Sequence, residues 1–180
     1  MKNRRLFFLI ALAVPLIMLV SLTIKPILTL QAGTPVTLET IHTDPRDVLF
    51  GDYVYLRFEV EELDRQYLNA ELKKTVDEAE SYGEVVVYAV LQQQGDLYTL
   101  QEVTLDRPTD GVFLKGTMNY YPAANMPRED NYYARFLPDQ FHVADSTRTE
   151  LESLSRSGRL LAHLKVRNGF AIIESVEAVE

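Results

Sequence analysis

"RLLAHLKVRNGFAIIESVEAV", residues 159–179, is the stretch that specifies the fold of this chain most strongly. Two runs of alternating apolar and polar residues flank Asn168-Gly169, a pair that favours the positive φ angles of a two-residue type I′ turn. The C-terminus is therefore predicted to be an antiparallel β-hairpin. Pairing outward from the turn gives the expected partners: Leu164 with Ile173, His163 with Glu174, and Ala162 with Ser175.

Further strands are predicted upstream of this hairpin. The run 53–61 alternates strictly, with Val54, Leu56, Phe58 and Val60 on one face. The run 84–94 is apolar on both faces and therefore predicts a central strand. Gly95-Asp96 joins it to the next strand through a turn of type II′. The other predicted strands are 36–42, 97–105, 112–120, 132–136 and 140–143.

Two segments have helical periodicity instead. In residues 66–81, apolar side chains recur at helical spacing and Gly83 can end the helix. Residues 145–158 begin with an Asp or Ser cap and stop at Gly158, which predicts a second short helix. The predicted fold class is α+β: an N-terminal transmembrane helix followed by a mainly antiparallel β domain with two short surface helices.

The N-terminus differs from the rest of the chain. Lys2, Arg4 and Arg5 precede an apolar run, 6–24, that contains no charged residue. A helix of this length is about 30 Å long and would span the lipid bilayer. The run predicts either a cleaved signal peptide or an uncleaved anchor. Its length and the lack of suitable small residues for cleavage favour the anchor.

The chain is therefore expected to have three parts: a cytoplasmic tip and transmembrane anchor (1–25), a juxtamembrane linker (26–35) and an extracytoplasmic domain (36–180). The basic N-terminus should stay in the cytoplasm, so that the protein is a single-pass protein of the cell membrane with its C-terminal domain outside.

Charge and composition exclude several classes of function. The whole chain carries a net charge of −8, and residues 1–25 contain four basic and no acidic residues, which leaves −12 on the remainder. A domain this acidic should avoid nucleic acid and anionic lipid surfaces. The chain has no cysteine, which excludes disulfides, thiolate metal sites and cysteine nucleophiles.

The acidic turn "DPRDVLFGDYVYLRF", residues 44–58, is the candidate site. Gly51 permits a positive φ or a close backbone approach before the strand. Asp52 shares the parity of the apolar face, so its carboxylate should point toward the core and accept hydrogen bonds there. Loop N–H groups would supply them, and Arg46 or Arg135 would balance the charge. In this interpretation Asp52 attaches the loop to the sheet.

A second interpretation of the same turn stays open. Asp44, Asp47 and Asp52 could form a hard-cation or ligand site, although their spacing differs from that of an EF-hand. His42 lies beside them and could act as a base in a hydrolase. The sequence shows no complete set of nucleophile, base and orienting residue, and no phosphate loop or zinc motif. It therefore identifies no catalytic residue, no metal site and no cofactor.

"GDYVYLRF", residues 51–58, resembles the signature of the GDYXXLXY protein family. The lead-in "DPRDVLF" and the segments "ARFLPDQFHVADSTRTELE" and "GRLLAHLKVRNGFAIIESV" are also similar to that family. Phe58 stands where the family has Tyr, so the hydroxyl is not required here. Leu56 and Phe58 lie on the apolar face of the motif strand, and Tyr53 lies on the opposite face, toward solvent or a partner.

The resemblance implies a membrane-anchored bacterial protein of unassigned function, often associated with multi-spanning membrane proteins. Together with the missing catalytic set, it favours a binding or scaffold module for another membrane or envelope protein. The alternative is a hydrolase or a ligand- or metal-binding domain that uses Asp44, Asp47 and Asp52 with His42. The expected partners are the lipid bilayer, through residues 6–24, and a multi-spanning membrane protein, but no nucleic acid.

Overall fold

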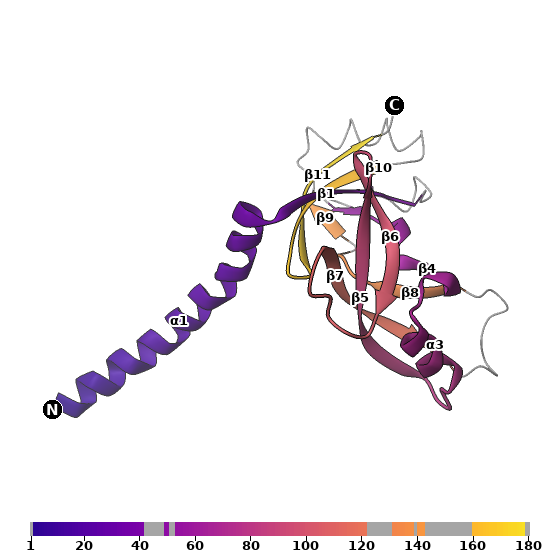
Figure 1. Cartoon of the computed structure of the whole chain (residues 1–180). Coiled ribbons are helices and arrows are strands. Elements are labelled where there is room, and N and C mark those ends of the chain that lie inside the picture. The colour runs from indigo at the N-terminus through magenta and orange to yellow at the C-terminus, as the bar shows by residue number, and fades with distance from the viewer. Residues whose placement is uncertain are drawn as a thin grey trace.

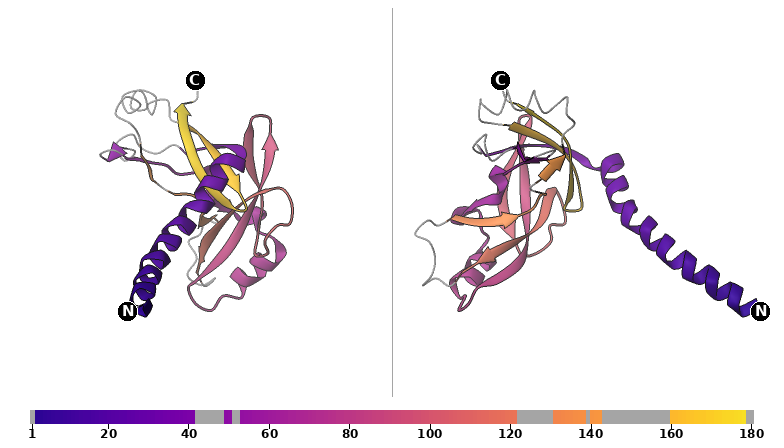
Figure 2. Two further views of the ribbon diagram at one scale, coloured as in Figure 1. Left: turned by 90° about the vertical axis from the view of Figure 1, so that its left-hand side faces the viewer. Right: turned by 180° about the vertical axis from the view of Figure 1, so that it is seen from behind.

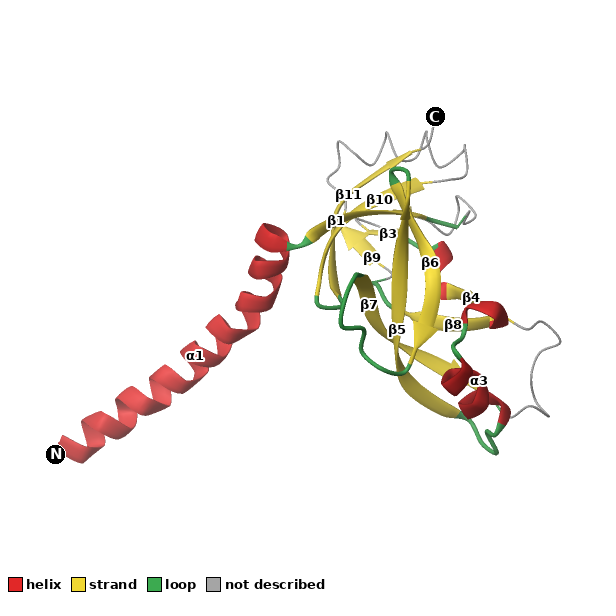
Figure 3. Ribbon diagram, viewed as in Figure 1, coloured by secondary structure: helices red, strands yellow, loops and turns green. Residues whose placement is uncertain are grey.

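The structure of the chain is a computed structural model that describes residues 2–41, 49–50, 53–121, 131–138, 140–142 and 160–178. A long N-terminal helix leads into a domain built mostly of strands (Figures 1 and 3). In chain order the elements are α1 (Lys2–Ala32), β1 (Thr34–Glu39), β2 (Leu49–Phe50), β3 (Tyr53–Tyr55), η1 (Glu59–Glu61), β4 (Glu62–Asp64), η2 (Arg65–Tyr67), α3 (Ala70–Asp77), β5 (Gly83–Gln94), β6 (Leu97–Thr104), β7 (Val112–Tyr120), β8 (Asn131–Arg135), β9 (Gln140–His142), β10 (Leu160–Arg167) and β11 (Phe170–Ala178).

Three antiparallel sheets form the domain, in the orders β1-β10-β11, β2-β3-β9 and β4-β8-β7-β5-β6. They curve around one apolar core in a half-barrel, and the Lys115 N–H joins two of them by donating to the Gly169 carbonyl oxygen at 2.9 Å. The largest fully buried side chains of the core include Phe58, Leu38, Leu63, Leu68, Leu72, Leu114 and Met118. The α+β class predicted from the sequence is confirmed.

The C-terminal hairpin has the predicted turn but not the whole predicted register. Asn168 and Gly169 have φ angles of 52° and 80°, and Leu164 pairs with Ile173 as expected. Beyond that point a β-bulge makes Glu174 an extra residue, so His163 lies opposite Ser175. The expected pairing of His163 with Glu174 is therefore wrong, as is that of Ala162 with Ser175. His163 instead binds Glu177 through Nε2, at 2.9 Å.

The β5–β6 hairpin also contains a bulge. Gly95 has a φ of 64°, which fits the first central residue of the predicted type II′ turn. Val90 pairs with Glu102 whereas Leu91 pairs with Leu100, so Gln101 is an extra residue in β6. Because β6 is the last strand of its sheet, this bulge interrupts an exposed edge, which opposes pairing with another chain.

The strand predicted over 53–61 is shorter in the structure. It ends at Tyr55, and only an isolated bridge between Phe58 and Thr40 continues it. Residues 59–61 form a 3₁₀ turn, closed by the Glu61 N–H donating to the Phe58 carbonyl oxygen at 3.0 Å. The turn has three residues per repeat, so the alternation of a strand is lost and both Val60 and Glu61 become buried.

The first predicted surface helix is confirmed in part. Helix α3 covers Ala70–Asp77 rather than 66–81, because Asn69 caps it: the Asn69 side-chain oxygen accepts the Leu72 N–H at 2.8 Å. A 3₁₀ turn, η2, occupies the residues before it. The second predicted helix, 145–158, lies outside the described residues.

The N-terminal helix is longer than predicted. It runs through Pro15 and Pro26 to Ala32, so most of the expected linker, 26–35, is helical and its last two residues already belong to β1. Figures 1 and 2 show α1 projecting away from the domain on the side of β1, β10 and β11. Within the described residues, Ala11–Ala32 is the one helix long and apolar enough to cross a membrane; a signal sequence near an N-terminus shares these properties.

Candidate functional site

Leu56 and Phe58 of the motif lie in the core. Leu56 is 2% exposed and Phe58 is fully buried, as their parity predicted. The backbone of Tyr53 is in β3, opposite His142 of β9. The motif strand is thereby placed beside residues 140–142, which belong to a second segment that resembles the GDYXXLXY family.

The remaining predicted site residues cannot be placed. Asp44, Arg46, Asp47, Gly51 and Asp52 lie outside the described residues, as does His42. The attachment of the loop through Asp52, the cation site and the hydrolase therefore all stay predictions. Among the residues that the structure describes, no three His, Asp or Glu side chains converge in a way that could hold a metal ion.

A buried acid does join the motif region to the sheet, but it is Glu61. This side chain is 3% exposed. Its Oε1 accepts the backbone N–H groups of Phe136 and Leu137, at 2.9 and 3.1 Å, and the Tyr133 hydroxyl donates to Oε2 at 3.4 Å. The alternation of 53–61 assigned Glu61 to the solvent face, which is wrong, because the 3₁₀ turn rotates it inward.

Burial controls the titration of this acid. Desolvation raises the pKa of Glu61 above its ordinary value of 4.5, although the N–H groups of Phe136, Leu137 and Phe58 and the Tyr133 hydroxyl oppose the shift. Partial burial and the Glu61 carboxylate in turn raise the pKa of Tyr133. The Glu61 carboxylate accepts hydrogen bonds from two backbone amides and the Tyr133 hydroxyl, and Glu61 does not line the groove described below, so we interpret it as a structural residue that fixes the chain after β8.

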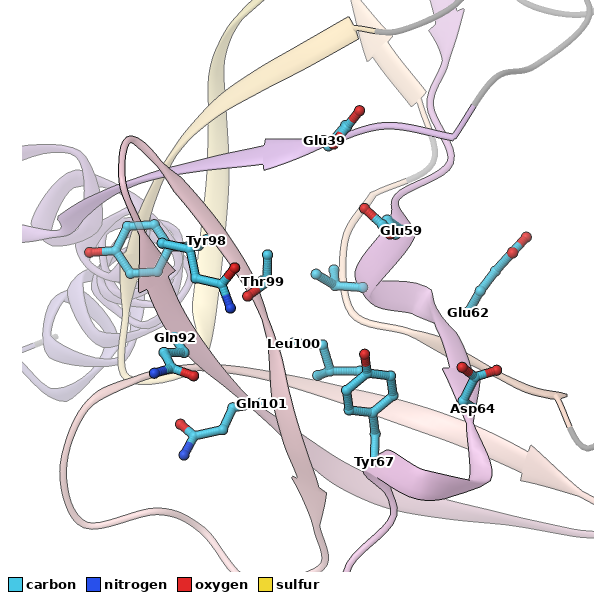
Figure 4. A pocket seen from close by; sticks show the side chains of 12 residues that line it. Glu39, Glu59, Glu62, Asp64, Tyr67, Gln92, Tyr98, Thr99, Leu100 and Gln101 are labelled. Carbon is cyan, nitrogen blue, oxygen red and sulfur yellow. The ribbon is translucent and has the colours of Figure 1, made fainter.

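A groove of about 560 Å³ opens beside this structural acid (Figure 4). One wall is formed by η1, β4 and η2 and carries Glu59, Glu62 and Asp64. The opposite wall is formed by β5 and β6 and carries the amides of Gln92 and Gln101. Glu39 of β1 lies at one end. Two tyrosines, Tyr67 and Tyr98, complete the polar lining.

The groove is polar and negative. Four of its twelve lining residues are carboxylates and none is basic; Arg57, which does not line the groove, pairs with Glu62 at 3.1 Å. Pockets for drug-sized molecules are mostly apolar, whereas this one offers carboxylates, amides and aromatic faces. Such a surface suits an extended, positively charged ligand, since cations bind both carboxylates and tyrosine rings.

The groove could not be predicted from the sequence. Its walls come from residues about 40 positions apart in the chain. They meet where Leu68 bridges to Val103 of β6 and the Asn69 N–H donates to the Val103 carbonyl oxygen at 3.0 Å. The acidic run "EVEELD", residues 59–64, was the available signal. Alternation over 53–61 assigned Glu59 and Glu61 to the face opposite the apolar residues, and nothing in the sequence placed β6 beside this run.

The comparisons with known proteins give one positive result. The family model described as "GDYXXLXY protein" matches residues 15–176, which is most of the chain. The chain belongs to the GDYXXLXY family. The family resemblance expected from residues 51–58 is thus confirmed. No curated protein matches the chain. No solved structure matches it either.

The match to the family model covers most of the features described above. The match to the GDYXXLXY family includes the motif strand, Glu61, both walls of the groove and the C-terminal hairpin. The matched region also begins inside α1, at residue 15. Members of the family have no assigned biochemical function, so the function of this GDYXXLXY protein has to be argued from its surfaces.

Proposed function

We propose that this protein is an outward-facing binding module, anchored by α1, that holds a positively charged extended segment of another membrane or envelope protein. One observation carries the proposal: the open groove between β6 and the segment 59–67, with carboxylates on one wall and amides on the other. The proposal keeps the N-terminus in the cytoplasm, because the basic residues Lys2, Arg4 and Arg5 precede the apolar run.

The lining explains why a peptide segment is preferred over other ligands. Lys and Arg side chains would find partners in Glu59 and Asp64, and their stems could lie on the rings of Tyr67 and Tyr98. The amides of Gln92 and Gln101 can donate to and accept from a peptide backbone. Nucleic acid would be repelled by the same carboxylates.

The test uses the full chain in detergent micelles and a fluorescein-labelled peptide of alternating lysine and arginine. Fluorescence anisotropy gives its dissociation constant for the wild type and for Glu59→Gln/Asp64→Asn. Exposed ion pairs are worth about 0.2–1 kcal/mol each, so we expect the double variant to bind about 2- to 30-fold more weakly. Binding should also weaken as salt is added.

The matched control is Glu78→Gln/Glu80→Gln, which removes the same charge from exposed positions that do not line the groove. This pair should change the dissociation constant only slightly. If both double variants weaken binding equally, the peptide responds to net charge alone and the groove is not its site. A wild type that does not bind the peptide at low salt would also contradict the proposal.

A further inference from the structure

The tip of the β10–β11 hairpin lies against the outer part of α1. Lys25 Nζ lies 4.2 Å from the centre of the Phe170 ring, which is the first residue of β11. A cleft of about 420 Å³ separates the two elements and is lined by Ile24, Lys25 and Leu28 on the helix and by Arg167 and Asn168 on the tip. The domain therefore reaches back along α1 toward its apolar segment.

The contact between Lys25 and Phe170 sets the position of the hairpin tip along the axis of α1. Lys25 is the first charged residue after the apolar run 6–24, so the uncharged part of the candidate span ends there and the Lys25 ammonium should lie at the level of the headgroups. It lies seven residues before the end of α1, which is about 10 Å along the helix axis. The hairpin tip is at this level, whereas β1 begins further out. If α1 spans the bilayer, the tip lies among the lipid headgroups.

Basic residues gather at this tip although the domain as a whole is acidic. Lys165 and Arg167 are on the same face of β10, because they are two residues apart in the strand. Arg107 donates to the Asn168 side-chain oxygen at 3.3 Å, and the Lys115 N–H donates to the Gly169 carbonyl oxygen at 2.9 Å. Together with Lys25 they make up the basic tip: Lys25, Arg107, Lys115, Lys165 and Arg167.

The charges of the basic tip are not neutralised locally. Elsewhere Arg57, Arg65 and Lys74 each pair with a carboxylate, at 3.1, 2.7 and 3.9 Å. None of the five residues of the basic tip forms an ion pair within the described part of the chain. The adjoining loop adds two acids, Asp106 and Asp110, so positive charge remains in excess.

We propose that the basic tip binds the headgroups of anionic phospholipids, with a lipid phosphate in the cleft between Lys25 and Arg167. The cleft offers partners for both parts of a phospholipid: Lys25 and Arg167 supply the cations, and Ile24, on the membrane side of Lys25, continues the apolar surface of α1. The inference rests on the insertion of α1 in the proposed function. It departs, for this face, from the expectation that so acidic a domain avoids anionic lipid.

The test places the full chain in lipid nanodiscs and measures the distance of the tip from the headgroups. Because the chain has no cysteine, Thr109→Cys in the loop beside the tip gives a single labelling site for a bimane fluorophore. A nitroxide on the headgroup of a trace lipid quenches it. We expect stronger quenching in discs of phosphatidylcholine with phosphatidylglycerol than in phosphatidylcholine alone, and weaker quenching at high salt.

Charge reversal identifies the residues responsible. Each cation near an anionic surface contributes about a fivefold change in the ratio of docked to undocked protein. Lys165→Glu/Arg167→Glu should therefore abolish the effect of phosphatidylglycerol. The matched control, Lys73→Glu/Lys74→Glu on α3, makes the same charge change away from the tip and should keep it. A label at Asp96→Cys, at the other end of β6, should be quenched little in every disc.

Three results would overturn the proposal: equal quenching in both lipids, equal effects of the two double variants, or loss of quenching when inorganic phosphate is added, which would show a site for free phosphate. Failure of the proposed function is recognised separately. A chain that does not assemble into phosphatidylcholine discs lacks a membrane anchor, and a groove that binds no basic peptide leaves the lipid result unaffected.

Discussion

The two oxygens of the Glu61 carboxylate accept different numbers of hydrogen bonds. Its Oε1 accepts two backbone hydrogen bonds, from Phe136 and Leu137, whereas Oε2 has only the 3.4 Å contact with the Tyr133 hydroxyl. A glutamine retains a carbonyl oxygen for the two N–H groups, and its amide can donate to Tyr133 instead. An alanine would leave both N–H groups buried without an acceptor.

We therefore expect Glu61→Ala to lower the free energy of unfolding by about 2–6 kcal/mol, since each of the two orphaned N–H groups costs about 1–3 kcal/mol. Glu61→Gln should stay within about 1 kcal/mol of the wild type for the same reason. Thermal and urea unfolding of the full chain in micelles, followed by circular dichroism, measures both. Equal losses for the two variants would show that the two amides do not depend on the side-chain oxygen.

The same residue gives a pH dependence of known sign. Burial raises the pKa of Glu61 above 4.5, so the folded chain holds this proton more tightly than the unfolded chain. The resulting stabilisation is complete below pH 4.5 and is lost as the pH rises through the folded pKa. Glu61→Gln does not titrate at this position. As the pH rises through this window, the melting temperature of the wild type should therefore fall relative to that of Glu61→Gln, and at higher pH the difference should stay constant. A difference that is constant with pH would contradict the shift.

At the scale of elements, alternation predicted the long strands because one of their faces is buried. Residues 84–94, 112–120 and the hairpin around Asn168 all form strands near the expected bounds. The bulges at Gln101 and Glu174 could not be predicted, since each is one polar residue in a strand that tolerates polar residues. Glu61 was misplaced for a related reason: "EVEE" fits a strand or a turn equally, and its contact with residues 136–137 decides between them.

The close approach of the paired strands β7 and β8 gives a prediction at this scale. Gly116 of β7 lies so close to β8 that a Cβ there would overlap the Arg135 carbonyl oxygen and would lie 2.6 Å from the Phe136 ring. Gly116→Ala should cost about 1–3 kcal/mol, although alanine suits a strand better than glycine does. Unfolding of the full chain measures the loss.

Thr117→Ala is the matched control, because it changes the next residue of β7 without entering this contact. It should cost less than about 1 kcal/mol. A Gly116→Ala protein as stable as the wild type would mean that the two strands can separate slightly at no cost.

At the scale of the whole molecule, the proposed topology is open to a direct test. Cells that express the chain with a C-terminal tag are converted to spheroplasts and treated with protease. We expect loss of the tag from intact spheroplasts, because α1 should hold the N-terminus inside and the domain outside. An N-terminal tag is the control and should stay protected. A C-terminal tag that survives in intact spheroplasts would reverse the proposed orientation.

Gly33 is the single residue between α1 and β1, and its N–H still donates to the Thr29 carbonyl oxygen at 2.8 Å. The next strand is hydrogen-bonded along its length to β10. The orientation of α1 is therefore coupled to that of the β1-β10-β11 sheet. A bilayer too thin for α1 makes such a helix tilt, and transmembrane helices commonly tilt by about 20°. If α1 spans the bilayer, the domain would therefore tilt together with the helix, and membrane thickness would change the direction in which the groove faces.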